Sequence, residues 1–117
     1  MKVEEFASLL FEIEVNTHIM HLQTTSFAQH SALNTVYQDI VNIRDRFIES
    51  YQGEYGIIKG YKNIQINEGS DPYKYIQECC KKIYAFQETL QDSYLKQIVD
   101  DAHELLYSAE YKLKFLK

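Results

Sequence analysis

The chain has 117 residues, 45% of them hydrophobic and 25% charged, with a formal net charge of −5. These values are typical of one globular domain and exclude a strongly basic nucleic-acid-binding protein, since neither end carries a basic segment. No apolar run is long enough to span a bilayer, and the first residues lack the apolar core of a secretory signal peptide.

The cysteine, proline and glycine content further limits the fold class and the cellular compartment that we expect. Cys79 and Cys80 are adjacent in the sequence, where a disulfide would be badly strained. We therefore expect two reduced, structural thiols and a cytoplasmic protein that does not enter a membrane. One proline and four glycines, together with long stretches of helical apolar period, predict an all-α protein.

The first helix is expected over about residues 3–22. Apolar residues at steps of three and four give it a core stripe, and a second stripe lies on another face. A helix with two such faces packs against two partners, one of which can be another subunit. The core stripe is Phe6, Leu9, Leu10, Ile13 and Met20, and the second stripe is Phe11, Val15, His18 and Leu22.

The second helix is expected over about residues 26–51. Ser26 and Gln29 have the spacing of a capping box that begins it. It also carries two stripes, and Glu49 lies one helical turn after Asp45 on the outer one. The core stripe is Leu33, Val36, Ile40, Ile43 and Phe47, and the second stripe is His30, Tyr37, Val41, Asp45 and Ile48.

Residues 52–70 lack a helical period and are predicted to form a long crossover, which Ile57, Ile58, Ile64 and Ile66 would pack against the bundle. Asp71 and Pro72 then begin a third helix over about 72–90, and Asp92 or Ser93 begins a fourth over about 93–116. The connection between the first two helices is short, the one between the second and third is long, and the one between the last two is short. This order is typical of the ferritin-like topology, so we expect one ferritin-like four-helix bundle over residues 1–117. The core faces are Tyr75, Ile76, Cys79, Ile83, Phe86 and Leu90, then Leu95, Ile98, Ala102, Leu105 and Ala109.

Four residues on the outer stripes are candidate metal ligands. His18, His30, Asp45 and Glu49 follow one another at intervals of 12, 15 and 4 residues. Two imidazoles and two carboxylates suit iron in both oxidation states, and zinc or manganese would use the same ligands. On one helix, however, His30 and Asp45 lie about 22 Å apart. Two copies packed antiparallel about a two-fold axis would bring the histidines of one to the carboxylates of the other.

The segment from His18 to His30, followed by Asp45 and Glu49, resembles the ferroxidase motif of Dps-type mini-ferritins. The resemblance covers about residues 14–50. It implies that His18 and His30 of one subunit, with Asp45 and Glu49 of its two-fold mate, bind Fe(II) and oxidise it with hydrogen peroxide or dioxygen. It further implies iron storage in a homo-oligomer built from two-fold dimers, up to a dodecameric cage.

The chain also departs from the pattern of that family. Ile19 stands where a tryptophan usually follows the first histidine, and Ser50 where an arginine is common. The segment from Leu22 to Thr25 replaces a glycine-containing turn. A lysine-rich DNA-binding tail is absent, so no DNA binding is expected.

Three further residues lie near the four predicted ligands in the sequence or on the same helix faces. His21 and Glu14 are candidates for orienting the ligands or for an accessory ligand, and Tyr37 is a candidate for orienting the ligands and for donating one electron, but packing is the simpler explanation of all three. Asp100 and His103 have the spacing of a di-iron carboxylate–histidine pair, but His103 falls outside the expected core stripe, so we reject that site.

The alternative function is a non-catalytic bundle that serves as a structural or interaction protein and uses the same polar residues only for packing.

Overall fold

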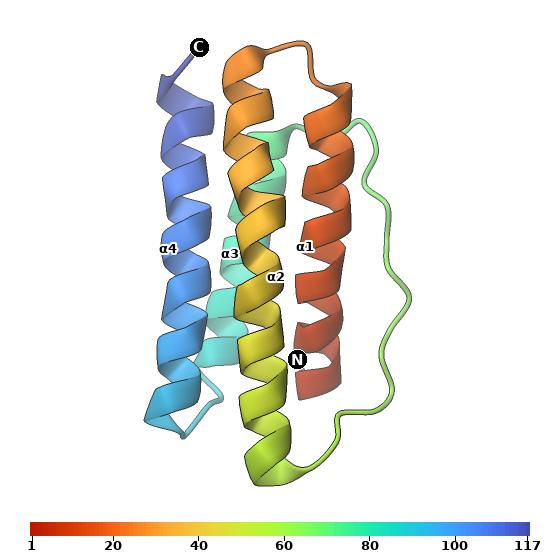
Figure 1. Ribbon diagram of the computed structural model, residues 1–117, viewed down its shortest axis with the longest axis vertical. Coiled ribbons are helices and arrows are strands. Elements are labelled where there is room, and N and C mark those ends of the chain that lie inside the picture. The colour runs from red at the N-terminus through yellow and green to blue at the C-terminus, as the bar shows by residue number, and fades with distance from the viewer.

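The computed structural model describes all 117 residues, and it contains four α-helices and no strand (Figure 1). The helices are α1 (Val3–Gln23), α2 (Phe27–Tyr55), α3 (Pro72–Gln87) and α4 (Ser93–Phe115). α2 extends four residues beyond the expected end at residue 51. α3 ends before residue 90, because Thr89 and Leu90 donate to the carbonyls three residues earlier and tighten the chain into a turn. None of the helices has the length and apolar character needed to cross a membrane.

Two antiparallel hairpins make up the bundle. α1 pairs with α2, and α3 with α4 (Figure 1). α2 also packs against α4, and α3 against α1, so that neighbouring helices run in opposite directions around the bundle. The segment between α2 and α3 passes along the outside of α1 from one end of the bundle to the other (Figure 1). The fold is therefore an all-α four-helix bundle with one long crossover.

The core lies where the sequence places it. The expected core residues of α1, α2 and α3 are all buried except Leu90, which is partly buried against the core. Toward the end of the bundle where α1 begins and α3 ends, the ring of Phe6 stacks on Phe86 with centroids 4.1 Å apart and meets the edge of Phe47 at 4.9 Å. On α4, the expected core residues Leu95, Ile98, Ala102 and Ala109 are buried, whereas Leu105 is only partly buried and the neighbouring Leu106 is fully buried.

A row of polar side chains on α1 holds the crossover. Ser8, Glu12 and Asn16 lie one helical turn apart on one face. Their side chains accept hydrogen bonds from backbone N–H groups of the crossover, and Asn16 also donates to a crossover carbonyl. The bonds are Lys62 N to Ser8 Oγ at 2.8 Å, Gln65 N to Glu12 Oε1 at 2.7 Å, Asn67 N to Asn16 Oδ1 at 2.8 Å, and Asn16 Nδ2 to Gln65 O at 2.8 Å.

Apolar packing of the crossover is weaker than the four isoleucines predict. Ile58 is buried, whereas Ile57, Ile64 and Ile66 are exposed. The expectation that all four pack against the bundle is wrong for three of them. An irregular segment still has to pair its backbone groups, and here the polar row on α1 provides those partners.

The helix starts follow the predicted capping residues with one difference. Ser26 Oγ accepts from Gln29 N at 3.2 Å, and Asp71 Oδ2 accepts from Lys74 N at 3.1 Å ahead of Pro72. Asp92 occupies the N-cap position of α4, but its side chain caps no N–H group. Its carboxylate instead accepts a hydrogen bond from the Tyr55 hydroxyl, which ties the end of α2 to the start of α4.

Candidate functional site

The second stripes of α1 and α2 form one outward-facing surface, which we call the outer α1–α2 face. Its side chains are half-buried or exposed, in contrast to the buried core stripes. At one end of the face, beside the short α1–α2 connection, Leu22 is 69% exposed and Phe27 is 75% exposed. All four predicted ligands, His18, His30, Asp45 and Glu49, are exposed to solvent on α1 and α2.

Two histidines next to the α1–α2 connection bind each other's backbone. His21 Nδ1 donates to the His30 carbonyl at 2.8 Å, and His30 Nδ1 donates to the His21 carbonyl at 2.9 Å. Their rings stack with centroids 3.7 Å apart. A carbonyl can only accept, so each Nδ1 must carry the proton and each Nε2 keeps its lone pair while the ring is neutral. The same arrangement orients histidine ligands in metal sites.

His18 belongs to the same cluster. Its ring lies parallel to that of Tyr37, with centroids 3.9 Å apart, and its centroid is 6.1 Å from that of His21. The Tyr37 hydroxyl donates to Asn34 Oδ1 at 3.0 Å. The structure therefore brings His18, His21, His30 and Tyr37 together, and His21 is buried within the group.

The carboxylates lie farther along α2 and have other partners. Asp45 Oδ1 accepts from Arg44 Nε at 3.0 Å, and Arg44 also pairs with Glu14. The Arg44 guanidinium lies 4.0 Å from the centroid of the Phe11 ring, a favourable cation–π position. Glu14 is thus a partner of Arg44 within one chain. Glu49 is exposed and makes no side-chain hydrogen bond or ion pair.

Within one chain the predicted ligands remain in two groups. His30 and Asp45 are on the same uninterrupted helix, about 22 Å apart at 1.5 Å per residue. No three histidine, cysteine, aspartate or glutamate side chains of the chain lie close enough to hold a metal ion. One copy therefore presents two histidines at one end of the face and two carboxylates at the other.

His103 differs from its expected position. The expected core stripe of α4 excludes it, but it is buried, with 9% of its surface exposed, and neither ring nitrogen has a hydrogen-bond partner. Burial lowers the pKa of its imidazole, and the Asp100 carboxylate opposes this shift only in part. Asp100 instead accepts a hydrogen bond from Gln87 Nε2 at 2.7 Å. The one signal of this burial in the sequence is the spacing of His103 from Val99 and Leu106.

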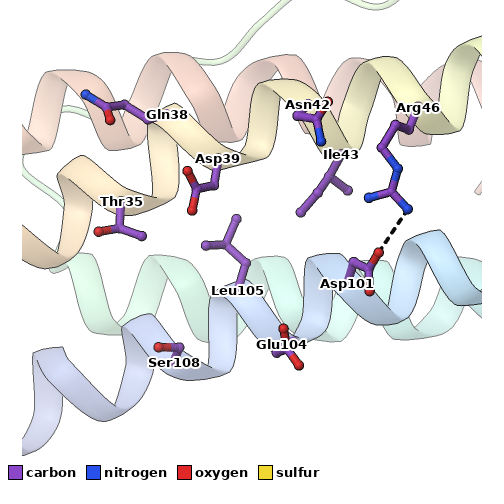
Figure 2. A pocket seen from close by; sticks show the side chains of 10 residues that line it. All are labelled: Thr35, Gln38, Asp39, Asn42, Ile43, Arg46, Asp101, Glu104, Leu105 and Ser108. Atoms are coloured by element: carbon purple, nitrogen blue, oxygen red, sulfur yellow. Dashed lines mark hydrogen bonds and ion pairs between the residues drawn. The ribbon is translucent and has the colours of Figure 1, made fainter.

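A polar groove of about 580 Å³ lies between α2 and α4 (Figure 2). The ion pair from Arg46 to Asp101, 3.0 Å long, bridges the two helices at one end. Asp39 and Glu104 extend from opposite helices on either side of Leu105 (Figure 2). These groups are not among the predicted ligands, and sequence reasoning did not identify the groove.

The two cysteines are free and buried in α3. Burial raises the pKa of both thiols to about 12. They remain protonated near neutral pH and are therefore poor nucleophiles and poor metal ligands. Their environment agrees with the structural role expected from the sequence.

Comparison with known proteins places the chain outside the mini-ferritins. A protein of Enterobacteria phage T4, described as an uncharacterized 14.6 kDa protein in the mobD-ri intergenic region, is 31% identical over 55 residues. These residues make up 47% of this chain and 43% of the phage protein, so the chain matches less than half of that relative. No solved structure matches the chain.

The family that matches residues 21–113 is described as a family of unknown function, DUF5856. No ferritin-like or Dps family matches, so the assignment to the Dps-type mini-ferritins is wrong. The ligand spacing on which it rested is a short pattern on two helices, whereas the family match extends over most of the bundle. The chain therefore belongs to the DUF5856 family.

Proposed function

We propose that two copies of this protein pair through their outer α1–α2 faces and bind iron between them. At each of two equivalent sites, His18 and His30 would come from one copy and Asp45 and Glu49 from the other. The substrate is Fe(II), which is oxidised there by hydrogen peroxide or dioxygen. With peroxide, two Fe(II) ions give one electron each, and the peroxide takes both electrons and two protons to become two water molecules.

The observation that carries this proposal is the reciprocal hydrogen bonding of His21 and His30. Each Nδ1 proton is held by a backbone carbonyl, which fixes the ring and leaves Nε2 as the free donor atom for a metal. The exposed ring of His18, held against Tyr37, adds a second imidazole to the same cluster.

Antiparallel pairing of α2 with a second α2 supplies the missing carboxylates. The midpoint between His30 and Asp45 falls at Tyr37 and Gln38, so a two-fold axis there sets His30 of one copy opposite Asp45 of the other. A two-fold contact is self-complementary and produces both sites at once. The half-buried Val41 and Ile48 would be covered by the same contact.

Arg44 keeps a partner when Asp45 turns toward the metal. It pairs with Glu14 as well as Asp45, and it lies over the ring of Phe11. Moving the exposed Asp45 carboxylate away therefore does not leave an unpaired buried cation, which would cost several kcal/mol. Glu49 has no partner to give up.

The course of the chain supports a ferritin-like arrangement of the four helices, in which the crossover makes diagonal helices parallel. The buried, protonated thiols of Cys79 and Cys80 support a reducing compartment such as the cytoplasm. Larger assemblies, up to a cage, would be built from the same two-fold pair.

Anaerobic titration with Fe(II), followed by peroxide, tests the proposal through Fe(III) absorbance and native mass. Wild-type protein should bind about one Fe(II) per chain or more and oxidise it as a dimer or a multiple of a dimer. His30→Ala and Asp45→Ala should each abolish oxidation, because each removes a ligand from both sites. Asp39→Ala, which changes an exposed carboxylate of α2 that is not a predicted ligand, is the matched control and should behave as wild type.

A monomer, or a dimer that oxidises Fe(II) no faster than buffer, would contradict the proposal. Full oxidation by both His30→Ala and Asp45→Ala would show that the iron site lies elsewhere. Circular dichroism of each variant confirms that a lost activity is not a lost fold. Because His30 also bonds the His21 carbonyl, His18→Ala serves as a second variant that leaves this contact intact and should also abolish oxidation.

A non-catalytic interaction protein is the second candidate. It is favoured by the exposure of Leu22 and Phe27 beside the histidine cluster, because large exposed apolar side chains mark contact surfaces. In that case the outer α1–α2 face binds a partner and the polar residues only pack. A metal-independent dimer that does not bind Fe(II) would favour this candidate.

A further inference from the structure

A second concave site lies on the opposite hairpin, between α3 and α4. It is a hollow of about 440 Å³, and three of its lining residues are the tyrosines Tyr73, Tyr84 and Tyr107. Tyr84 is 57% exposed and Tyr107 55% exposed, so neither serves mainly to fill the core. We call this hollow the tyrosine cage.

The charges around the tyrosine cage favour a cation. Glu110 lines it and takes part in no hydrogen bond or ion pair of the chain. Burial raises the pKa of its carboxyl, and no cation offsets that effect. Lys81 is the only basic residue in the lining, and its ammonium is 3.7 Å from Glu78 Oε1, outside the lining.

The imidazole that packs against the tyrosines of the cage adds no positive charge to it. His103 approaches Tyr84 and Tyr107, with ring centroids 6.1 and 5.8 Å apart. Burial lowers the pKa of this imidazole, so it is neutral near pH 7. The thiol of Cys80, which also lines the cage, is protonated. The walls are therefore largely aromatic, the Lys81 ammonium is paired with Glu78, and the Glu110 carboxylate lacks a partner.

We propose that the tyrosine cage binds the alkylammonium group of a small organic cation. Aromatic faces attract such a cation through the quadrupole of the ring, and more strongly where the site excludes water. The Glu110 carboxylate neutralises its charge. A neutral apolar ligand would cover that carboxylate without pairing it, which is unfavourable, and an anion would be repelled. This site is independent of the proposed iron site on α1 and α2.

Choline and 3,3-dimethylbutan-1-ol make a matched pair of probes, because they share shape and hydroxyl and differ in the charge of the central atom. Titration of the ¹⁵N-labelled chain should show choline shifting the backbone amides of Gln77, Tyr84, Tyr107 and Glu110. The neutral alcohol should bind at least about tenfold more weakly, since 1.4 kcal/mol corresponds to a factor of ten.

Substitutions on α4 distinguish a specific cation site from non-specific binding to exposed aromatic side chains. Tyr107→Ala and Glu110→Gln should each weaken choline binding by about fivefold or more, whereas Tyr107→Phe keeps the aromatic face and should bind within about twofold of wild type. Tyr111→Ala is the matched control, since Tyr111 is also exposed on α4 but does not line the cage. It should leave choline binding unchanged.

Equal binding of choline and the neutral alcohol would overturn the proposal, as would choline shifts confined to other parts of the chain. Unchanged affinity in both Tyr107→Ala and Glu110→Gln would also overturn it. If Tyr107→Ala fails to fold, Glu110→Gln still decides the matter, because it removes the charge of the carboxylate and keeps the volume of the side chain. Loss of iron oxidation in other variants has no bearing on this result.

Discussion

His103 is the one buried side chain of the protein whose polar atoms have no hydrogen-bond partner. It lies on α4 between the rings of Tyr84 and Tyr107. Such a residue is tolerated as a neutral imidazole, because charging it would place an unpaired cation among apolar groups. Its protonation is therefore linked to the stability of the whole bundle.

The free energy of unfolding should fall as the pH drops below about 6.5, the ordinary pKa of histidine in an unfolded chain. Burial lowers the pKa of folded His103, so between the two pKa values the unfolded chain binds more protons. The stabilisation is fully present above about pH 6.5 and is lost as the pH falls through the folded pKa. Urea unfolding from pH 5 to 8 measures this dependence.

His103→Leu is the control for that experiment, because leucine fills a similar volume and does not titrate. The pH dependence of the variant should be smaller than that of wild type over the same range. Identical curves for the two proteins would show that His103 does not carry the effect.

Single residues also show where the sequence was informative. Ser26 and Asp71 act as the predicted caps, because capping depends on local backbone geometry. The reciprocal bonds of His21 and His30 depend on how α1 and α2 meet, which no local pattern encodes. The pairing of Asp92 with Tyr55 likewise joins residues that are distant in sequence.

At the scale of elements, the crossover is held more by polar bonds than by apolar packing. Asn16 is the centre of this attachment, being 1% exposed. It bonds the Gln65 carbonyl, the Asn67 N–H and, at 3.2 Å, the Tyr75 hydroxyl. One side chain thus fixes the end of the crossover to both α1 and α3.

Asn16→Ala should lower the free energy of unfolding by roughly 2–3 kcal/mol, because it leaves buried polar groups without partners. Amide hydrogen exchange should accelerate at residues 65–67 more than in the helices, since the crossover loses its attachment. Asn63→Ala, at an exposed position of the same segment, is the control and should change stability by less than about 0.5 kcal/mol. Equal exchange rates in Asn16→Ala and wild type would contradict this role.

The helices themselves were predictable because their apolar periods are long and regular. The crossover was predicted as a segment, but its four isoleucines suggested apolar packing, and only Ile58 is buried. The polar row of Ser8, Glu12 and Asn16 was visible in the sequence at intervals of four. It could not be interpreted there, because a polar stripe on a helix normally faces solvent.

For the whole molecule, the central question is whether the outer α1–α2 face is completed by a second copy. In one chain, about 22 Å along α2 separates His30 in the histidine cluster from Asp45. Sequence spacing predicted this separation correctly, because the rise of a helix is fixed. Sequence spacing did not identify the family, because a few ligands on two helices can match where the rest of the chain does not.

Mixing two inactive variants is the most direct test of a site shared between subunits. His30→Ala and Asp45→Ala are unfolded together, refolded as a mixture, and assayed for Fe(II) binding and oxidation. A mixed dimer carries both changes in one site and none in the other, so random pairing should restore about a quarter of the wild-type sites. Each variant refolded alone, and wild type refolded with the double variant, are the controls. Recovery in the mixture is the predicted result, and a mixture as inactive as its separate components would contradict a shared site.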